Sequence, residues 1–166
     1  MRILGIDPGT HHMGIGLVED DGGAVRCLHF EVISADSRLP LPERLRDIHA
    51  RLAAVIEAWK PDAAAVEEPF AAKNIRAAIA VGQAEAVAML AAAQRNLPIT
   101  TYAPAQIKRA VTDYGGSSKE QVQEMVRILL VLPQTPTEPD AADALAVALC
   151  HHAAYRVQQL TSRARS

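Results

Sequence analysis

Four carboxylates stand where the chain would otherwise bury apolar groups. Asp7 ends the apolar run "RILGID" and Glu67 ends "AAAVE", while Asp140 and Asp143 are the only charges in "PDAADALAVAL", residues 139–149. Two like charges three residues apart on a helix repel each other, and burying them unpaired is costly. These acids therefore need a partner of positive charge.

The positions of the four acids suggest where they meet. Sites in α/β sheets form outside the carboxyl ends of parallel strands, which is where Asp7 and Glu67 are expected to lie. Asp140 and Asp143 share one helix face, roughly 60° apart around the axis. Oxygen ligands without histidine or thiolate suit Mg²⁺ or Mn²⁺. We therefore expect the missing partner to be a divalent cation, and in fact a pair of them.

Each acid also has a simpler interpretation. Asp140 lies in the first turn of its helix, where an anion is favourable without any metal. Asp7 precedes Pro-Gly and could be an ordinary turn aspartate, and Glu67 could be a solvated loop acid like Glu68. Asp143 lies deeper among alanines and fits such a reading less well. All four acids together, at strand ends and on one helix face, favour a site.

Hydrophobic periodicity predicts the elements that position these acids. Five segments read as strands, the first three as an antiparallel meander: 2–7, 15–19, 24–34, 63–67 and 99–102. Helical patterns cover 41–59, 75–96, a segment from Pro104 to the loop at 112–118, a segment to about Val131, and a last helix that carries the aspartate pair. Ser117 and Glu120 have the spacing of a capping box for the fourth helix.

Composition indicates a single soluble domain. The chain has 166 residues, 49% hydrophobic and 22% charged, which suits one core. We expect an α/β fold, a mixed five-stranded sheet flanked by helices on both faces. Residues 1–157 form this domain and 158–166 a flexible C-terminal tail. Because no apolar run reaches roughly 18 residues and no signal peptide is evident, we expect no membrane segment.

Charge and cysteine usage add two weaker indications. Residues 71–127 carry seven basic and four acidic side chains, against seven and twelve in residues 1–70, which suggests a local anion-binding face. Cys27 and Cys150 have no metal-ligand spacing, and two lone thiols fit a reducing cytoplasm. His11 and His12 are adjacent in a turn, where histidines are most often plain surface, so we leave them outside the site.

Several motifs, taken in order, resemble the RuvC family of bacterial crossover junction endodeoxyribonucleases, which resolve Holliday junctions. The resemblance runs from Arg2 to about Tyr155. "GIDPG" alone would be weak, but the ordered set is specific: "GIDPGT" (5–10), "VEEPF" (66–70), "AAKN" (71–74), "VGQA" (81–84), "QIK" (106–108), "SSKEQVQEMV" (117–126) and "DAADALAVAL" (140–149).

The resemblance implies an RNase H-like nuclease fold and a homodimer. It also implies symmetric, Mg²⁺-dependent hydrolysis of four-way junction DNA, which leaves 5′-phosphate and 3′-hydroxyl nicks in recombination and repair. Two Mg²⁺ ions per site, with Mn²⁺ as a substitute, and the RuvA–RuvB branch-migration complex as partner come with it. The family's catalytic, metal-binding tetrad matches Asp7, Glu67, Asp140 and Asp143. Its DNA contacts match Phe70, Lys108 and Lys119.

Three further features of the sequence accompany this resemblance. Pro69 departs from the more flexible residue expected beside Phe70, which affects the aim of that ring. Lys73 and Arg76 are secondary candidates for phosphate binding. The small residues of helix 75–96 suit either a two-fold dimer interface or packing on the protein's own sheet.

Three other functions compete with junction cleavage. The "DPGT" turn also fits the phosphate-binding proteins of the actin and sugar-kinase type, but those normally need two lobes. An RNase H-like relative that acts on RNA or on other DNA structures would keep the carboxylates and lack the matches at Phe70, Lys108 and Lys119. A junction-binding protein that does not cleave would have no need of an intact tetrad.

Overall fold

The computed structural model describes residues 1–69 and 75–163, and within them five strands form one sheet in the order β3-β2-β1-β4-β5. The strands are β1 (Arg2–Asp7), β2 (His12–Asp20), β3 (Val25–Ser34), β4 (Ala63–Glu67) and β5 (Ile99–Tyr102). β1, β2 and β3 are antiparallel neighbours, while β4 runs parallel to both β1 and β5. The predicted meander and mixed sheet are confirmed, and the carboxyl ends of β1 and β4 lie side by side.

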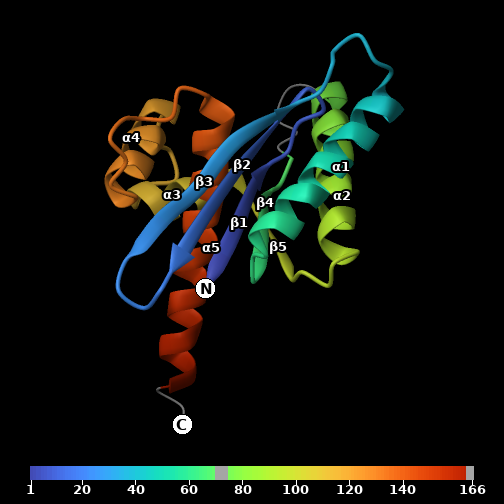
Figure 1. Cartoon of the computed structure of the whole chain (residues 1–166). Helices are drawn as coiled ribbons and strands as arrows, with labels where there is room; N and C mark the ends of the chain where they lie inside the picture. The colour runs from blue at the N-terminus through green and yellow to red at the C-terminus, as the bar shows by residue number, and fades with distance from the viewer. Residues whose placement is uncertain (70–74, 164–166) are drawn as a thin grey trace.

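Helices cover both faces of the sheet, as the sequence predicts (Figure 1). α1 (Leu41–Trp59) and α2 (Ile75–Ala93) pack on one face. The other face carries α3 (Pro104–Thr112), α4 (Lys119–Leu129) and α5 (Pro139–Arg163). α5 runs along the sheet and its C-terminal part extends past the sheet edge.

The alternation of side chains along β1 assigns each residue to one of two cores. Leu4 and Ile6 are fully buried in the core that α1 and α2 close. Ile3 points to the opposite core, which is formed with α3, α4 and α5. Gly5, between Leu4 and Ile6, faces the same side as Ile3, directly under α5.

Three glycines of β1 and β2 let the backbone of α5 lie directly on the sheet. A Cβ added at Gly5 would stand 2.0 Å from the carbonyl oxygen of Ala144, and one at Gly14 would stand 1.9 Å from that of Asp140. At Gly16 the nearest atom would be the amide nitrogen of Leu145, at 2.6 Å. No side chain fits at these distances, so glycine is required there. The contact holds the first turns of α5 at the carboxyl end of β1.

The structure corrects several predicted boundaries. β2 begins at His12 rather than at residue 15, because residues 12–14 pair with the end of β3. α5 is helical to Arg163, so the tail predicted from 158 begins inside a helix. The capping box of α4 is formed by Ser118 and Gln121, one residue later than predicted. Ser117 cannot serve as the cap since its buried hydroxyl bonds to the carbonyl oxygen of Tyr114, at 2.9 Å.

α2 stands out by its combination of length and apolar composition. Within the described residues it is the one helix long and apolar enough to cross a membrane, and only 22% of its apolar window is buried. A single helix of this length and composition does not establish a membrane span, so the expectation of no membrane segment stays a prediction. The prediction counted uninterrupted apolar runs, and Arg76, Gln83 and Glu85 interrupt this one. Length and composition alone do not separate a span from a helix that binds another protein.

Candidate active site

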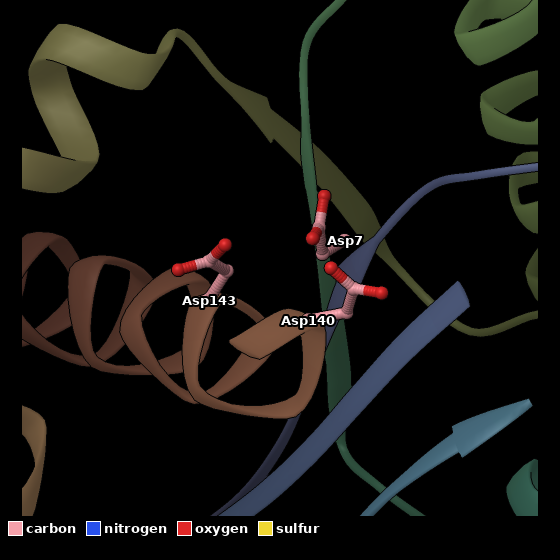
Figure 2. Close-up of side chains that lie close together, drawn as sticks. All are labelled: Asp7, Asp140 and Asp143. Atoms are coloured by element: carbon pink, nitrogen blue, oxygen red, sulfur yellow. The ribbon is translucent and has the colours of Figure 1, made fainter. Parts of the chain in front are cut away.

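Three of the predicted acids converge at the end of β1. Asp7 extends from the strand, while Asp140 and Asp143 extend from the first turns of α5 toward it (Figure 2). One carboxylate oxygen from each of the three lies within 4.8 Å of the others. This is a spacing at which three oxygens can ligate one hard divalent cation.

The electrostatics of the cluster call for a cation. Burial, followed by the charges of Glu67, Asp143 and Asp140, raises the pKa of Asp7 to about 8. Burial is also the main reason that the pKa of Asp143 is raised. Acids that keep their protons near neutral pH do so because, if all were ionised, their negative charge would exceed what the surroundings can stabilise. An all-oxygen set with this surplus fits Mg²⁺ or Mn²⁺.

Glu67 lies at the same edge of the sheet, one strand away. Ile6 of β1 and Val66 of β4 are partners in the parallel pair. Asp7 and Glu67 are the next residue on each strand and therefore lie side by side. Burial, and then the charge of Asp143, raises the pKa of Glu67 to about 7. Glu67 is not part of the three-oxygen group, but it lines the same cleft as Asp143 of α5. Its neighbour Glu68 instead accepts a hydrogen bond of 2.7 Å from Thr101 on β5.

Two lysines line a cleft beside the acids. The cleft has a volume of about 160 Å³ and is lined by Glu67, Pro104, Ile107, Lys108, Lys119, Val122 and Asp143. The Nζ of Lys119 lies 2.6 Å from Oδ2 of Asp143. The Nζ of Lys108 donates to the carbonyl oxygen of Ser117 at 2.8 Å. Both predicted DNA-contacting lysines therefore lie next to the carboxylates.

Other predicted residues lie away from the cluster or cannot be placed. Phe70 and Lys73 fall outside the described residues. Arg76 is exposed near the start of α2. His12 shares a hydrogen bond of 3.1 Å with Ser34 of β3, and His11 contacts the guanidinium of Arg44 on α1. The two histidines thus have partners of their own, in line with leaving them outside the site.

Two residues whose role here the sequence did not indicate fix the loop at 112–118, which joins α3 to α4. Thr112 and Ser117 share a hydrogen bond of 2.7 Å, and Thr112 also donates to the carbonyl oxygen of Lys108. Together with the bond from Lys108 to Ser117, these contacts hold residues 112–118 against α3. Their only sequence signal is a run of small polar residues and glycines, which is typical of any loop.

Comparison with known proteins gives one consistent result. Residues 3–151 match the family model of crossover junction endodeoxyribonuclease RuvC. A crossover junction endodeoxyribonuclease RuvC from Dehalococcoides mccartyi is 53% identical over 152 residues, which cover 92% of this chain and 91% of the relative. The protein of the same name from Chloroflexus aggregans is 51% identical, covering 91% and 92%.

Solved structures agree with these sequence matches. Thermus thermophilus RuvC is 39% identical and superposes with a TM-score of 0.86, covering 95% of this chain and 97% of that one. The same protein in complex with its Holliday junction substrate gives a TM-score of 0.89, covering 95% and 96%. The yeast mitochondrial Holliday junction resolvase Ydc2, at 16% identity and a TM-score of 0.62, shares the fold.

Proposed function

The chain belongs to the RuvC family of crossover junction endodeoxyribonucleases, and from that premise we propose which residues hold its metal, bind its DNA and pair two copies. It is a nuclease with an RNase H-like α/β fold that cleaves Holliday junctions in recombination and repair. Its family is dependent on divalent metal, and the acidic cluster agrees with this. The roles of single residues are the substance of the proposal.

The convergence of Asp7, Asp140 and Asp143 carries the metal assignment. We assign two Mg²⁺ ions, with Mn²⁺ as a substitute, to these three acids and Glu67. Asp7 belongs to the three-oxygen group and is also close enough to Glu67 for the two charges to interact, so it would help to hold the ions together with both. When bound, two such ions supply an activated water and stabilise the departing 3′-oxygen. The carboxylates themselves would hold the ions beside the cleft.

The two lysines of the cleft reduce the repulsion between the acids and the DNA backbone. A polyanion approaches an acidic site only if positive side chains hold its phosphates, and such contacts position the strand without reading its sequence. Lys108 and Lys119 line the cleft next to Glu67 and Asp143 and are suited to this role. We assign Phe70 to stacking on an unpaired base at the crossover, since it follows Glu67 by three residues.

The exposed face of α2 supports a homodimer. Ile75, Ile79 and Leu90 are 73%, 57% and 52% exposed and share one side of the helix with the small Ala86. A contiguous apolar stripe of this kind marks a contact with another protein. A two-fold axis through α2 would present two active sites to a junction, which suits symmetric nicks with 5′-phosphate and 3′-hydroxyl ends.

Family membership supports two further assignments. We assign the protein to the cytoplasm, in keeping with its free thiols Cys27 and Cys150, and expect the RuvA–RuvB complex as its partner. The sugar-kinase interpretation of the "DPGT" turn falls with the family match. An RNase H-like enzyme acting on RNA falls with it as well.

One cleavage assay tests these assignments. The protein is incubated with a synthetic four-way junction, plain duplex and an RNA–DNA hybrid, with Mg²⁺, Mn²⁺ or a chelator. We expect paired nicks in the junction alone, which ligase seals, and no product with the chelator. Cleavage of duplex or hybrid at a similar rate, or nicks in one strand only, would contradict the proposal.

A further inference from the structure

Lys119 is bound to a carboxylate that the metal needs. Its ammonium lies 2.6 Å from Oδ2 of Asp143, one of the three acids whose oxygens lie within 4.8 Å of one another. At such distances a second cation near the same oxygens would be strongly repelled by the ammonium. The ammonium and a divalent ion therefore compete for Asp143.

The surroundings of Lys119 allow its side chain to leave without moving its backbone. Lys119 is the first residue of α4, and the Ser118 and Gln121 capping box fixes that helix end. The preceding Ser117 is buried and bonded to Lys108 and Thr112. The side chain itself is 51% exposed and lies at the cleft. Rotation about its flexible stem is enough to carry the ammonium from Asp143 to the mouth of the cleft.

We propose that Lys119 couples metal binding to DNA binding: the metal displaces its ammonium from Asp143, and the freed ammonium binds a phosphate of the junction. This inference rests on the proposed metal site and adds a role that neither the acids nor a plain phosphate contact has. In the free protein Lys119 weakens metal binding. In the DNA complex the phosphate holds the ammonium, and Asp143 is available to the metal.

Thermodynamic linkage makes this coupling reciprocal. If a phosphate on Lys119 strengthens metal binding by some factor, the metal strengthens phosphate binding by the same factor. The enzyme without DNA therefore has a low metal occupancy, and this occupancy rises when the enzyme binds DNA. Lys108 provides a matched comparison because it lines the same cleft with the same charge but donates to a backbone carbonyl rather than to a carboxylate.

The first experiment measures Mn²⁺ affinity by calorimetry in the absence of DNA, for the wild type, Lys119→Met, Lys119→Arg and Lys108→Met. We expect Lys119→Met to bind Mn²⁺ about fivefold or more tightly, at the lower end of typical coupling factors. Lys119→Arg keeps a cation on Asp143 and should resemble the wild type. Lys108→Met should change the affinity much less. Circular dichroism establishes that each variant is folded.

The second experiment follows Lys119 directly. Acylation by an amine-reactive ester, read by mass spectrometry, should be slow at Lys119 in metal-free protein and faster with Mn²⁺, while exposed Lys60 stays constant. Equal affinities for Lys119→Met and Lys108→Met, or unchanged acylation of Lys119, would overturn the coupling and leave the metal site standing. Absence of Mn²⁺ binding in every protein would overturn the metal site and the coupling together.

Discussion

A carboxylate that is largely removed from water stays ionised only when a cation balances it, and Asp7 is the clearest case in this chain. Its pKa of about 8 has burial as the first cause and the neighbouring acids as the next. Since Asp7 belongs to the three-oxygen group that we propose to hold metal, it should matter more for the reaction than for folding.

We predict that Asp7→Asn lowers Mg²⁺-dependent junction cleavage by about 100-fold or more, since even residues behind metal ligands contribute 10- to 100-fold. Junction binding should change little because the phosphate-binding lysines remain. Single-turnover cleavage and fluorescence anisotropy measure the two effects. Glu57→Gln, an exposed change on α1, is the control and should behave as the wild type. A parallel loss of DNA affinity would argue against a metal role for Asp7.

The raised pKa values predict how the metal-free protein responds to pH. The folded protein keeps protons on Asp7 and Glu67, whose pKa values are about 8 and about 7, that the unfolded chain loses near pH 4. Their contribution to stability is therefore fully present below about pH 4 and is lost as the pH rises toward 8. Asp20, with a pKa lowered to about 2, changes only below this window.

Urea unfolding in a chelator at pH 5.5 and pH 8 measures this effect. We expect the free energy of unfolding to fall by about 1 kcal/mol or more between them, since one pKa unit corresponds to about 1.4 kcal/mol. Added Mg²⁺ should remove the fall, because it replaces the protons. Asp7→Asn should flatten the pH dependence without metal. A stability that rises over this range in the wild type would contradict the assigned charges.

At this scale the sequence predicted which acids meet but not how they are arranged. Asp7, Asp140 and Asp143 were recognisable because a charge at the end of a buried strand, or inside an apolar helix, needs an explanation. The ion pair between Lys119 and Asp143 was not predictable, since it depends on where α4 begins relative to α5. The capping box shows the same difficulty, because Ser117 and Ser118 both satisfied the sequence pattern.

Among the elements, α5 and the strands beneath it determine the geometry of the site. The periodicity of apolar residues predicted all five strands and the helices on both faces, because burial of alternate residues leaves a direct pattern. The direct contact of α5 with the sheet at Gly5, Gly14 and Gly16 left no such pattern. A glycine in a strand has many causes, and only the packed structure reveals that the helix backbone lies against it.

We predict that Gly14→Ala displaces the start of α5 from the sheet. Its Cβ would stand 1.9 Å from the carbonyl oxygen of Asp140, so helix and strand must separate. Overpacking of this kind typically costs 1–3 kcal/mol, and we expect about 2 kcal/mol or more here. Urea unfolding gives the stability and Mn²⁺ calorimetry the integrity of the site.

Gly23→Ala serves as the matched control for this change. Its Cβ would meet only an oxygen of Asp21 at 3.4 Å, in the turn between β2 and β3. Stability and Mn²⁺ affinity should therefore remain close to those of the wild type. If Gly14→Ala were as well tolerated as Gly23→Ala, the direct contact between helix and sheet could not be what positions Asp140.

For the whole molecule, the exposed apolar stripe of α2 is the surface through which we propose that two copies pair. We predict that Ile79→Glu, which places a charge at its centre, shifts the protein from dimer to monomer in light scattering. Paired nicking of a junction should then give way to single, uncoordinated nicks. Val157→Glu, at a similarly exposed position on α5, is the control and should stay dimeric. If Ile79→Glu remained a dimer, the interface would have to lie on another surface.

The contact between β1 and α5 also makes completion of the site depend on the order in which the chain is synthesised. Asp7 precedes its partners Asp140 and Asp143 by most of the domain, so the three acids can meet only after the start of α5 has been synthesised. At roughly 5–20 residues per second, about 7 to 27 seconds separate the synthesis of Asp7 from that of Asp140. A nascent or prematurely terminated chain that lacks α5 has half of its acids and no completed cleft. Since the proposed metal site needs Asp140 and Asp143, we expect such fragments not to cut DNA.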